Sequence, residues 1–276
     1  MIDLHTHTTA SDGRCSPEEL TARAAGAGVT VLGLTDHDTV AGCAAAAAAC
    51  ARHGIVFVPG IEITAVTSER DVHVLGYGFD TASASLLAFL AEQRQRRVAR
   101  VREMIERLAR HRIRLDADGI LAPGLADSSR AVGRPWIARA LVEAGHAADH
   151  NEAFDRLLSR GRPAYVPREG PAPADVFTRL REAGGLSSLA HPALVRHDEW
   201  IPRFAEEGLD AIEAYHSDHD GLDTARYLHF ARDLTLLVTG GSDYHADSAH
   251  GGGGPGSVSL PREHFDRLRP RLKIDG

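Results

Sequence analysis

The strongest constraint on the fold is a regular alternation of short apolar segments with helical segments along this 276-residue chain. One helical segment starts at Ser16 and Pro17, a cap residue followed by proline at the first helical position. Alternation of this kind is typical of βα units around a largely parallel sheet. It predicts an α/β fold, a distorted (β/α)7 TIM-like barrel, with an open doubly wound sheet as the alternative. The expected strands are 2–8, 29–35, 56–66 with a bend near residue 60, 72–78, 186–190, 211–215 and 235–239.

The pattern changes in the middle of the chain, between residues 83 and 167. Apolar residues such as Val101, Ile105 and Leu108 recur there at helical spacing, and arginines occupy the other faces. We therefore predict a catalytic barrel made of residues 1–82 and 168–276, and a helical insertion at 83–167 that caps the substrate.

The composition excludes several classes of protein. The net charge of −7 argues against a protein that coats long nucleic acid, although a small phosphorylated substrate remains possible. No apolar run is long enough for a membrane span, and the first residues do not follow the pattern of a secretory leader, so we expect neither a membrane span nor export. The three cysteines, Cys15, Cys43 and Cys50, have no Cys-x-x-Cys spacing and are expected to be reduced thiols. We therefore predict a cytoplasmic protein with no membrane partner; the oligomeric state is left open.

Histidine and carboxylate residues follow nearly every expected strand. His5 and His7 are two residues apart, so on a strand their side chains point to the same side. A single histidine at a strand end is more often a hydrogen-bonded loop residue than a ligand, but the joint pattern is an improbable accident. In a parallel barrel these strand ends converge on the active-site face. The other residues in the pattern are Asp36, His37, Asp38, Glu62, His73, His191, His216, Asp243 and His245.

These side chains limit the cofactor. Imidazole and carboxylate ligands without cysteine suit zinc, manganese or iron. Two or three such divalent ions would polarise a phosphoryl group, generate hydroxide at neutral pH, and hold the attacking and leaving oxygens. We therefore expect a hydrolase that acts on phosphoric esters by attack of metal-bound hydroxide.

The same residues resemble the motifs of the polymerase-and-histidinol-phosphatase (PHP) family, over about 1–80 and 186–260. The motifs are His5-x-His7 with Asp12, Thr35-Asp36-His37-Asp38, Glu62, His73, His191-Pro192 and Ser242-Asp243-x-His245. The resemblance implies a distorted seven-stranded barrel with a trinuclear site. It implies that His5, His7, Glu62 and Asp243 hold one metal, that Glu62 bridges to a second with His73 and His191, and that Asp12, His37 and His245 hold the third.

Within that family, the short proteins with a helical insertion look most similar. They act on nucleoside 3′,5′-bisphosphates, releasing the 3′-phosphate, or trim short 5′-phosphorylated oligoribonucleotides. Residues 133–139 resemble the insertion motif in which an arginine contacts substrate phosphate, which makes Arg134 a candidate for substrate binding and catalysis. Trp136 could stack on a base or belong to the insertion core. His216 is a candidate substrate contact or leaving-group acid, or a buried structural histidine.

Other functions remain open at this point. Within the same class, the chain could be a histidinol-phosphate phosphatase or a cyclic phosphodiesterase. An amidohydrolase-type deaminase also begins with His-x-His, but Asp12 and the second histidine after Asp243 point to a further metal site. A non-catalytic nucleotide-binding domain is the third alternative.

Overall fold

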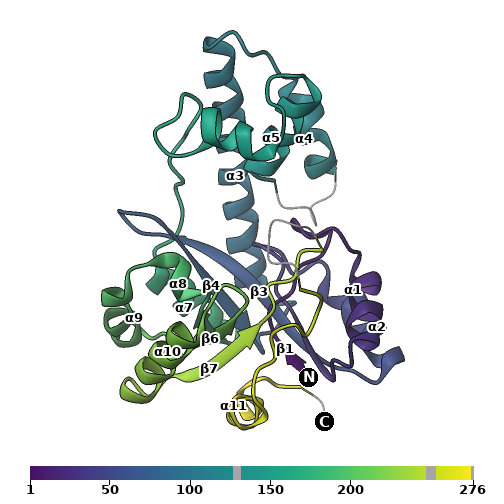
Figure 1. The fold of residues 1–276 in the computed structure, drawn as a ribbon, viewed down its shortest axis with the longest axis vertical. Coiled ribbons are helices and arrows are strands. Elements are labelled where there is room, and N and C mark those ends of the chain that lie inside the picture. Colours follow the sequence, from purple (N-terminus) through teal and green to yellow (C-terminus); the bar gives the residue numbers. More distant parts are fainter. Residues whose placement is uncertain (127–131, 247–252, 275–276) are drawn as a thin grey trace. The chain divides into compact units, whose positions relative to one another are not determined.

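The computed structural model describes residues 1–126, 132–246 and 253–274 and divides the chain into two compact units (Figure 1). The first unit, here called the barrel unit, comprises Met1–Ala88 and Pro171–Gly276; the second, the helical unit, comprises Phe89–Gly170. The boundary falls within helix α3 (Ala84–Arg110), so the insertion starts later than the change of sequence pattern at residue 83 suggests.

The barrel unit contains one seven-stranded sheet in the order β1 to β7. The sheet closes nearly completely, because the segment after β1 meets the segment at the end of β7: Leu4 N donates to Gly240 O (3.2 Å), and Thr6 forms a parallel bridge with Tyr244. The predicted distorted barrel is therefore confirmed, and the open sheet is excluded. The strands are β1 Ile2–Asp3, β2 Val31–Leu34, β3 Val56–Val66, β4 Asp71–Tyr77, β5 Leu186–Leu189, β6 Ala211–His216 and β7 Leu237–Gly241.

Strand β4 runs antiparallel to both of its neighbours, whereas the other pairs are parallel. The cause is local: β3 and β4 are joined by a tight turn closed by Thr67 N donating to Arg70 O (3.0 Å), too short for a parallel crossover. The start of β4 therefore lies at the end of the barrel where the parallel strands finish. This places His73, opposite Thr64 of β3, on the active-site face although it is near the start of its strand.

The first strand is much shorter than the predicted 2–8 and ends at Asp3. The carboxylate of Asp3 accepts hydrogen bonds from Ser242 N (2.9 Å), Ser242 Oγ (2.6 Å) and Gly256 N (2.7 Å). Beyond Asp3 the chain leaves regular strand pairing. At the other side of the closure, a Cβ on Gly241 would lie 2.3 Å from His5 N. Glycine at 241 thus allows the two chain segments to approach closely enough to close the barrel.

Helices cover the outside of the barrel (Figure 1). Helix α1 begins with the predicted cap, since Ser16 Oγ accepts from Glu19 N and the Glu19 carboxylate accepts from Ser16 N. Helix α7 packs on the sheet: a Cβ on Gly76 of β4 would lie 2.4 Å from Leu180. The helices of this unit are α1 Pro17–Gly26, α2 Cys43–His53, α7 Pro173–Glu182, α8 Pro192–Val195, α9 Ile201–Glu207, α10 Gly221–Asp233 and α11 Arg262–Leu268.

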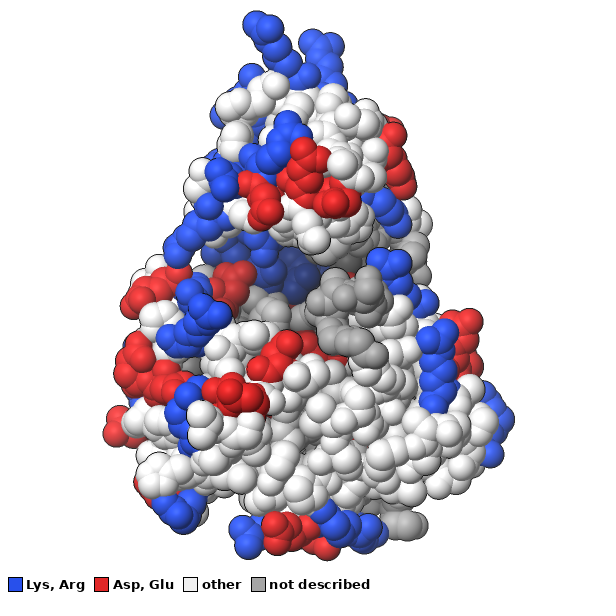
Figure 2. Space-filling view, in the orientation of Figure 1, with Lys and Arg blue, Asp and Glu red and all other residues white. Residues whose placement is uncertain are grey.

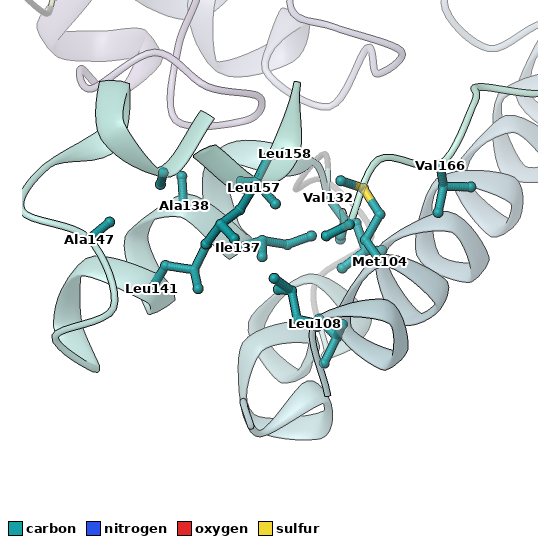
Figure 3. Packing of buried hydrophobic residues seen from close by; sticks show 14 of the residues in the cluster. Met104, Leu108, Val132, Ile137, Ala138, Leu141, Ala147, Leu157, Leu158 and Val166 are labelled. Atoms are coloured by element: carbon teal, nitrogen blue, oxygen red, sulfur yellow. The ribbon is translucent and has the colours of Figure 1, made fainter. Parts of the chain in front are cut away.

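The helical unit has its own apolar core, shown in Figure 3. Met104 and Leu108 of α3 pack there with Ile137 and Leu141 of α5. Arginines of α3 also bind loop carbonyls, as Arg100 Nε does with Val166 O (2.9 Å), while further arginine side chains are exposed on the visible face of this unit (Figure 2). Besides α3, the helices are α4 Ala117–Ala126, α5 Arg134–Glu143 and α6 His150–Ala153, followed by a π-helical turn at Phe154–Leu158.

Among the described residues, no helix combines the length and apolar character that crossing a lipid bilayer requires.

Candidate metal centre

A single buried carboxylate, Glu62 of β3, lies at the centre of the histidine cluster. Its side chain is only 1% exposed, and both of its oxygens face imidazole nitrogens. The distances from Oε1 are 2.8 Å to His73 Nδ1 and 3.1 Å to His191 Nε2; those from Oε2 are 3.5 Å to His5 Nε2, 3.3 Å to His7 Nε2 and 3.1 Å to His37 Nδ1.

Two further carboxylates complete the cluster. Asp243, just beyond β7, places Oδ1 3.2 Å from His5 Nε2 and 3.1 Å from His7 Nε2. Asp12 lies 3.3 Å from His245 Nε2 through Oδ1 and 3.5 Å from His37 Nε2 through Oδ2. The structure therefore brings all nine side chains of the predicted ligand set into one continuous cluster.

Within the cluster, groups of ligand atoms lie within 4.8 Å of one another, close enough to surround a metal ion. One group has the residues of the predicted first site. A second joins Glu62 and His73 with His37, whereas the predicted His191 contacts Glu62 at 3.1 Å, and a third adds His7 to the predicted Asp12, His37 and His245. These three groups are His5, His7, Glu62 and Asp243; His37, Glu62 and His73; and His7, Asp12, His37 and His245, and a fourth comprises His5, Glu213 and His216.

The chemistry of the first group fits a cation. His5 Nδ1 faces the carboxylate of Glu213 at 2.9 Å, so this nitrogen carries a hydrogen and the lone pair of a neutral His5 ring is on Nε2. Nε2 then faces the carboxylates of Glu62 and Asp243. All three groups can only accept a hydrogen bond, so a cation or a proton must lie between them. Nε2 of His5, Nε2 of His7 and Oδ1 of Asp243 are buried and make no hydrogen bond of normal geometry with any described residue. Divalent metal ions fit this set.

The pKa values show how strongly the cluster attracts positive charge. Burial alone would lower the pKa of His7, but the Asp243 and Glu62 carboxylates raise it to about 10. Burial lowers the pKa of His37 to about 3, helped by the positive charges of His7 and His73 and opposed by Glu62 and Asp12. In the metal-free protein, protons on some histidines thus take the place of cations.

Two of the candidate ligands have an unusual backbone. His191 has φ 29° and ψ 58°, and Asp243 has φ 53°, in the left-handed region that side-chain-bearing residues rarely adopt. Hydrogen bonds hold both residues: His191 N donates to Glu213 (2.8 Å) and Asp243 N donates to His5 O (2.8 Å). Strain of this kind concentrates at functional sites.

The loop that carries Asp12 is held by a carboxylate of the Thr-Asp-His-Asp motif. Asp36 is buried and accepts hydrogen bonds from Thr8 N (2.7 Å), Thr8 Oγ1 (2.7 Å) and Ser11 Oγ (2.7 Å). The side chain of Asp12 is 34% exposed and that of His73 is 28% exposed, whereas His5 and His7 are fully buried. A ligand would therefore reach the cluster on its Asp12 and His73 side.

His216, at the end of β6, touches the cluster through Asp243. Its Nδ1 accepts a hydrogen bond from Asp218 N (3.1 Å), so a neutral ring carries its hydrogen on Nε2. Nε2 lies 3.4 Å from Asp243 Oδ2. Nε2 of His216 thus faces Asp243 without a hydrogen bond of normal geometry to any described residue.

Glu213 is the residue of this site that the sequence analysis missed. It is fully buried in the middle of β6 and contacts both His5 and His191. The available signal was a carboxylate inside an otherwise apolar predicted strand, where a charge needs a buried partner.

The two candidate substrate residues belong to the helical unit. Arg134 is the first residue of α5, and its guanidinium lies 5.6 Å from the centre of the Phe154 ring. Trp136 packs against the buried apolar cluster of that unit, and a Cβ on Gly124 would lie 3.1 Å from its ring. Trp136 thus has a packing role; substrate contacts of either residue stay predictions.

Comparison with known proteins identifies the family of this chain. Residues 3–158 match the model of the PHP domain. The chain is 37% identical over 254 residues to the 5′-3′ exoribonuclease Rnm of Salmonella typhimurium, with 89% of this chain and 85% of that protein covered. It is 34% identical over 257 residues to the 3′,5′-nucleoside bisphosphate phosphatase of Chromobacterium violaceum, with 91% and 89% covered.

A solved structure is also similar to this chain over nearly its whole length. A Bifidobacterium adolescentis protein assigned to the metal-dependent phosphoesterases superposes with a TM-score of 0.86 at 31% identity, covering 98% of this chain and 95% of that one. The likeness extends over both units, whereas the matched family model ends within the helical unit at residue 158. The chain therefore belongs to the PHP family of metal-dependent phosphoesterases.

Proposed function

We propose that the cluster binds two or three divalent cations, manganese, zinc or iron, and hydrolyses a phosphate ester of a small nucleotide. The observation that carries the proposal is Glu62, a buried carboxylate whose two oxygens face five imidazoles. Within this set we assign His5, His7, Glu62 and Asp243 to one cation, Glu62, His73 and His191 to a second, and Asp12, His37 and His245 to the third. Bound there, the ions would act as Lewis acids toward a phosphoryl oxygen and lower the pKa of water.

The protein's own residues have separate roles in this proposal. His5, His7 and Asp243 form the buried wall of the site, where water has little access. Asp12 and His73 are the more exposed ligands, so the reacting phosphate approaches along their side. His216, whose Nε2 lies 3.4 Å from Asp243 Oδ2, is proposed as a substrate contact or as the acid that protonates the leaving oxygen.

For the substrate, we propose a nucleoside 3′,5′-bisphosphate or a short 5′-phosphorylated oligoribonucleotide. The support is the near full-length similarity to relatives that bear these two activities in their names. Arg134 is proposed to bind a substrate phosphate, since a guanidinium can make two parallel hydrogen bonds to phosphate oxygens. Base stacking on Trp136, a cytoplasmic location and the absence of a long nucleic-acid partner also stay predictions.

Metal binding should release protons, since ligands must be unprotonated to coordinate. The pKa of His7 is about 10 in the metal-free cluster against an ordinary 6.5, so His7 is protonated at pH 8. Its contribution to the stability of the metal-free protein is present below pH 6.5 and is lost as the pH rises through about 10. Metal-free protein is titrated with Mn²⁺ in a calorimeter at pH 8, once in Tris and once in HEPES. The two binding heats should differ by the number of protons released multiplied by the difference between the ionisation enthalpies of the two buffers. His7→Ala should release fewer protons and bind less metal; equal heats in both buffers would contradict this account.

The substrate class can be tested by phosphate release from a panel. The protein loaded with manganese, zinc or iron should release phosphate from adenosine 3′,5′-bisphosphate, or mononucleotides from a 5′-phosphorylated dinucleotide, faster than phosphate from histidinol phosphate. A cyclic phosphodiester and an aminopurine complete the panel. Preference for histidinol phosphate or the cyclic ester would overturn the substrate but keep the chemistry, and ammonia release without any phosphoester cleavage would favour a deaminase.

The role of Arg134 has a matched control on the same helix. Arg134→Ala should lower kcat/KM for the best substrate of the panel by roughly 10- to 100-fold, the loss expected for a charge-assisted hydrogen bond to phosphate. Arg139 is 62% exposed and pairs with Glu143 on α5, so Arg139→Ala should change kcat/KM little. Equal effects of the two substitutions would mean that Arg134 does not bind the substrate.

A further inference from the structure

Glu213 connects two candidate ligands that come from different strands. It is completely buried on β6, inside the barrel. Its Oε1 lies 2.9 Å from His5 Nδ1, and its Oε2 accepts a hydrogen bond from His191 N at 2.8 Å. Each oxygen therefore has a separate task, and the two tasks concern two different groups of ligands.

The first task is to fix the hydrogen on the His5 ring. A carboxylate can only accept, so Nδ1 must carry the hydrogen and Nε2 is left with the lone pair of the neutral ring. Nε2 is the nitrogen that faces Glu62 at 3.5 Å and Asp243 at 3.2 Å. Without Glu213, this contact would no longer favour that tautomer over the one with hydrogen on Nε2, which has no lone pair on Nε2 with which to bind a metal.

The second task is to hold the backbone of His191. This residue stands between β5 and Pro192 in the left-handed region of φ and ψ, which costs energy for a residue with a side chain. The bond from its N–H to Glu213 holds that conformation, and the conformation presents Nε2 to Glu62 Oε1 at 3.1 Å. Loss of the bond would let His191 turn away from Glu62.

The remaining group of ligands does not depend on Glu213. Asp12 lies on the loop held by Asp36, and His245 Nδ1 contacts the backbone oxygen of Asp243 at 2.8 Å. His37 follows β2 and pairs with Glu62 through an isolated bridge. The contacts just given place these residues against elements other than β6.

We propose that Glu213 is a positioning residue shared by two cation sites, orienting the His5 ring for one and the His191 backbone for the other, while the site of Asp12, His37 and His245 is independent of it. This inference rests on the proposed metal centre and adds to it a selective effect on the sites. A merely structural role would weaken all sites alike through loss of the fold.

The test is metal binding by Glu213→Gln in the full chain. The glutamine side chain has the same shape, but only one of its two terminal atoms can accept, so it leaves either His5 Nδ1–H or His191 N–H facing an NH2 group. Metal-free wild type and variant are equilibrated with Zn²⁺ at free concentrations set by chelator buffers, and bound zinc is measured by mass spectrometry. We expect zinc affinity to fall about 10- to 100-fold at up to two sites, with one site unchanged.

The control is Asp210→Asn, just before the same strand. Asp210 accepts hydrogen bonds from Ser187 N (3.0 Å) and Arg271 (2.9 Å), away from the histidines. This variant should melt at a lower temperature with unchanged zinc binding. If Glu213→Gln does not fold, Glu213→Asp keeps the charge but withdraws the carboxylate by one methylene, and the same selective loss is expected.

The outcomes separate the two proposals. If the wild type binds zinc and a folded Glu213 variant binds it with the same affinity at every site, the role of Glu213 is overturned and the metal centre is not. A uniform loss at every site would also overturn it, because that result indicates a general effect on folding. Failure of the wild type to bind any zinc or manganese would overturn the metal centre itself, and the role of Glu213 with it.

Discussion

The structure depends on one contact, the close approach of buried imidazole nitrogens to the carboxylate oxygens of Glu62. Its two carboxylate oxygens face five imidazole rings, and Asp243 brings another negative charge to His5 and His7. Buried charge without compensation is costly, so such a site is stable only with protons or metal ions among the acceptors. Its histidines come from both ends of the chain, which requires the barrel to close around it.

Closure and ligand placement depend on the same contacts. Residues 4–7 bond to residues 240–244 through Leu4 N to Gly240 O, His7 N to Tyr244 O and Asp243 N to His5 O. Asp3 adds a buried carboxylate that accepts from Ser242 and Gly256. A change that opens this seam would separate His5 and His7 from Asp243, so barrel stability and metal affinity are coupled. Glu213 extends the same principle to β5 and β6, where one carboxylate holds a ring and a backbone.

The alternation of apolar and helical segments predicted the barrel and the convergence of the strand-end side chains. The grouping of those side chains into three metal sites came from the resemblance to the PHP family and stays a prediction. Strand-end histidines and carboxylates are conspicuous when apolar segments alternate with helices, and parallel strands bring their ends together. The direction of β4 was missed although the short 67–70 turn indicates a hairpin. Glu213 was missed because a carboxylate within a strand reads equally well as solvent-facing until its partners are known. Substrate choice could not be predicted from these patterns, since they indicate which side chains converge and not which substrate groups those side chains contact.

The most direct test of the metal centre is anomalous X-ray diffraction from crystals of manganese-loaded protein, with data on both sides of the manganese absorption edge. The account predicts anomalous peaks on both sides of the Glu62 carboxylate, one beside His5, His7 and Asp243 and one beside His73 and His191. A third peak beside Asp12 and His245 would show that three ions bind. Manganese bound only elsewhere, with no peak in contact with Glu62, would contradict the account.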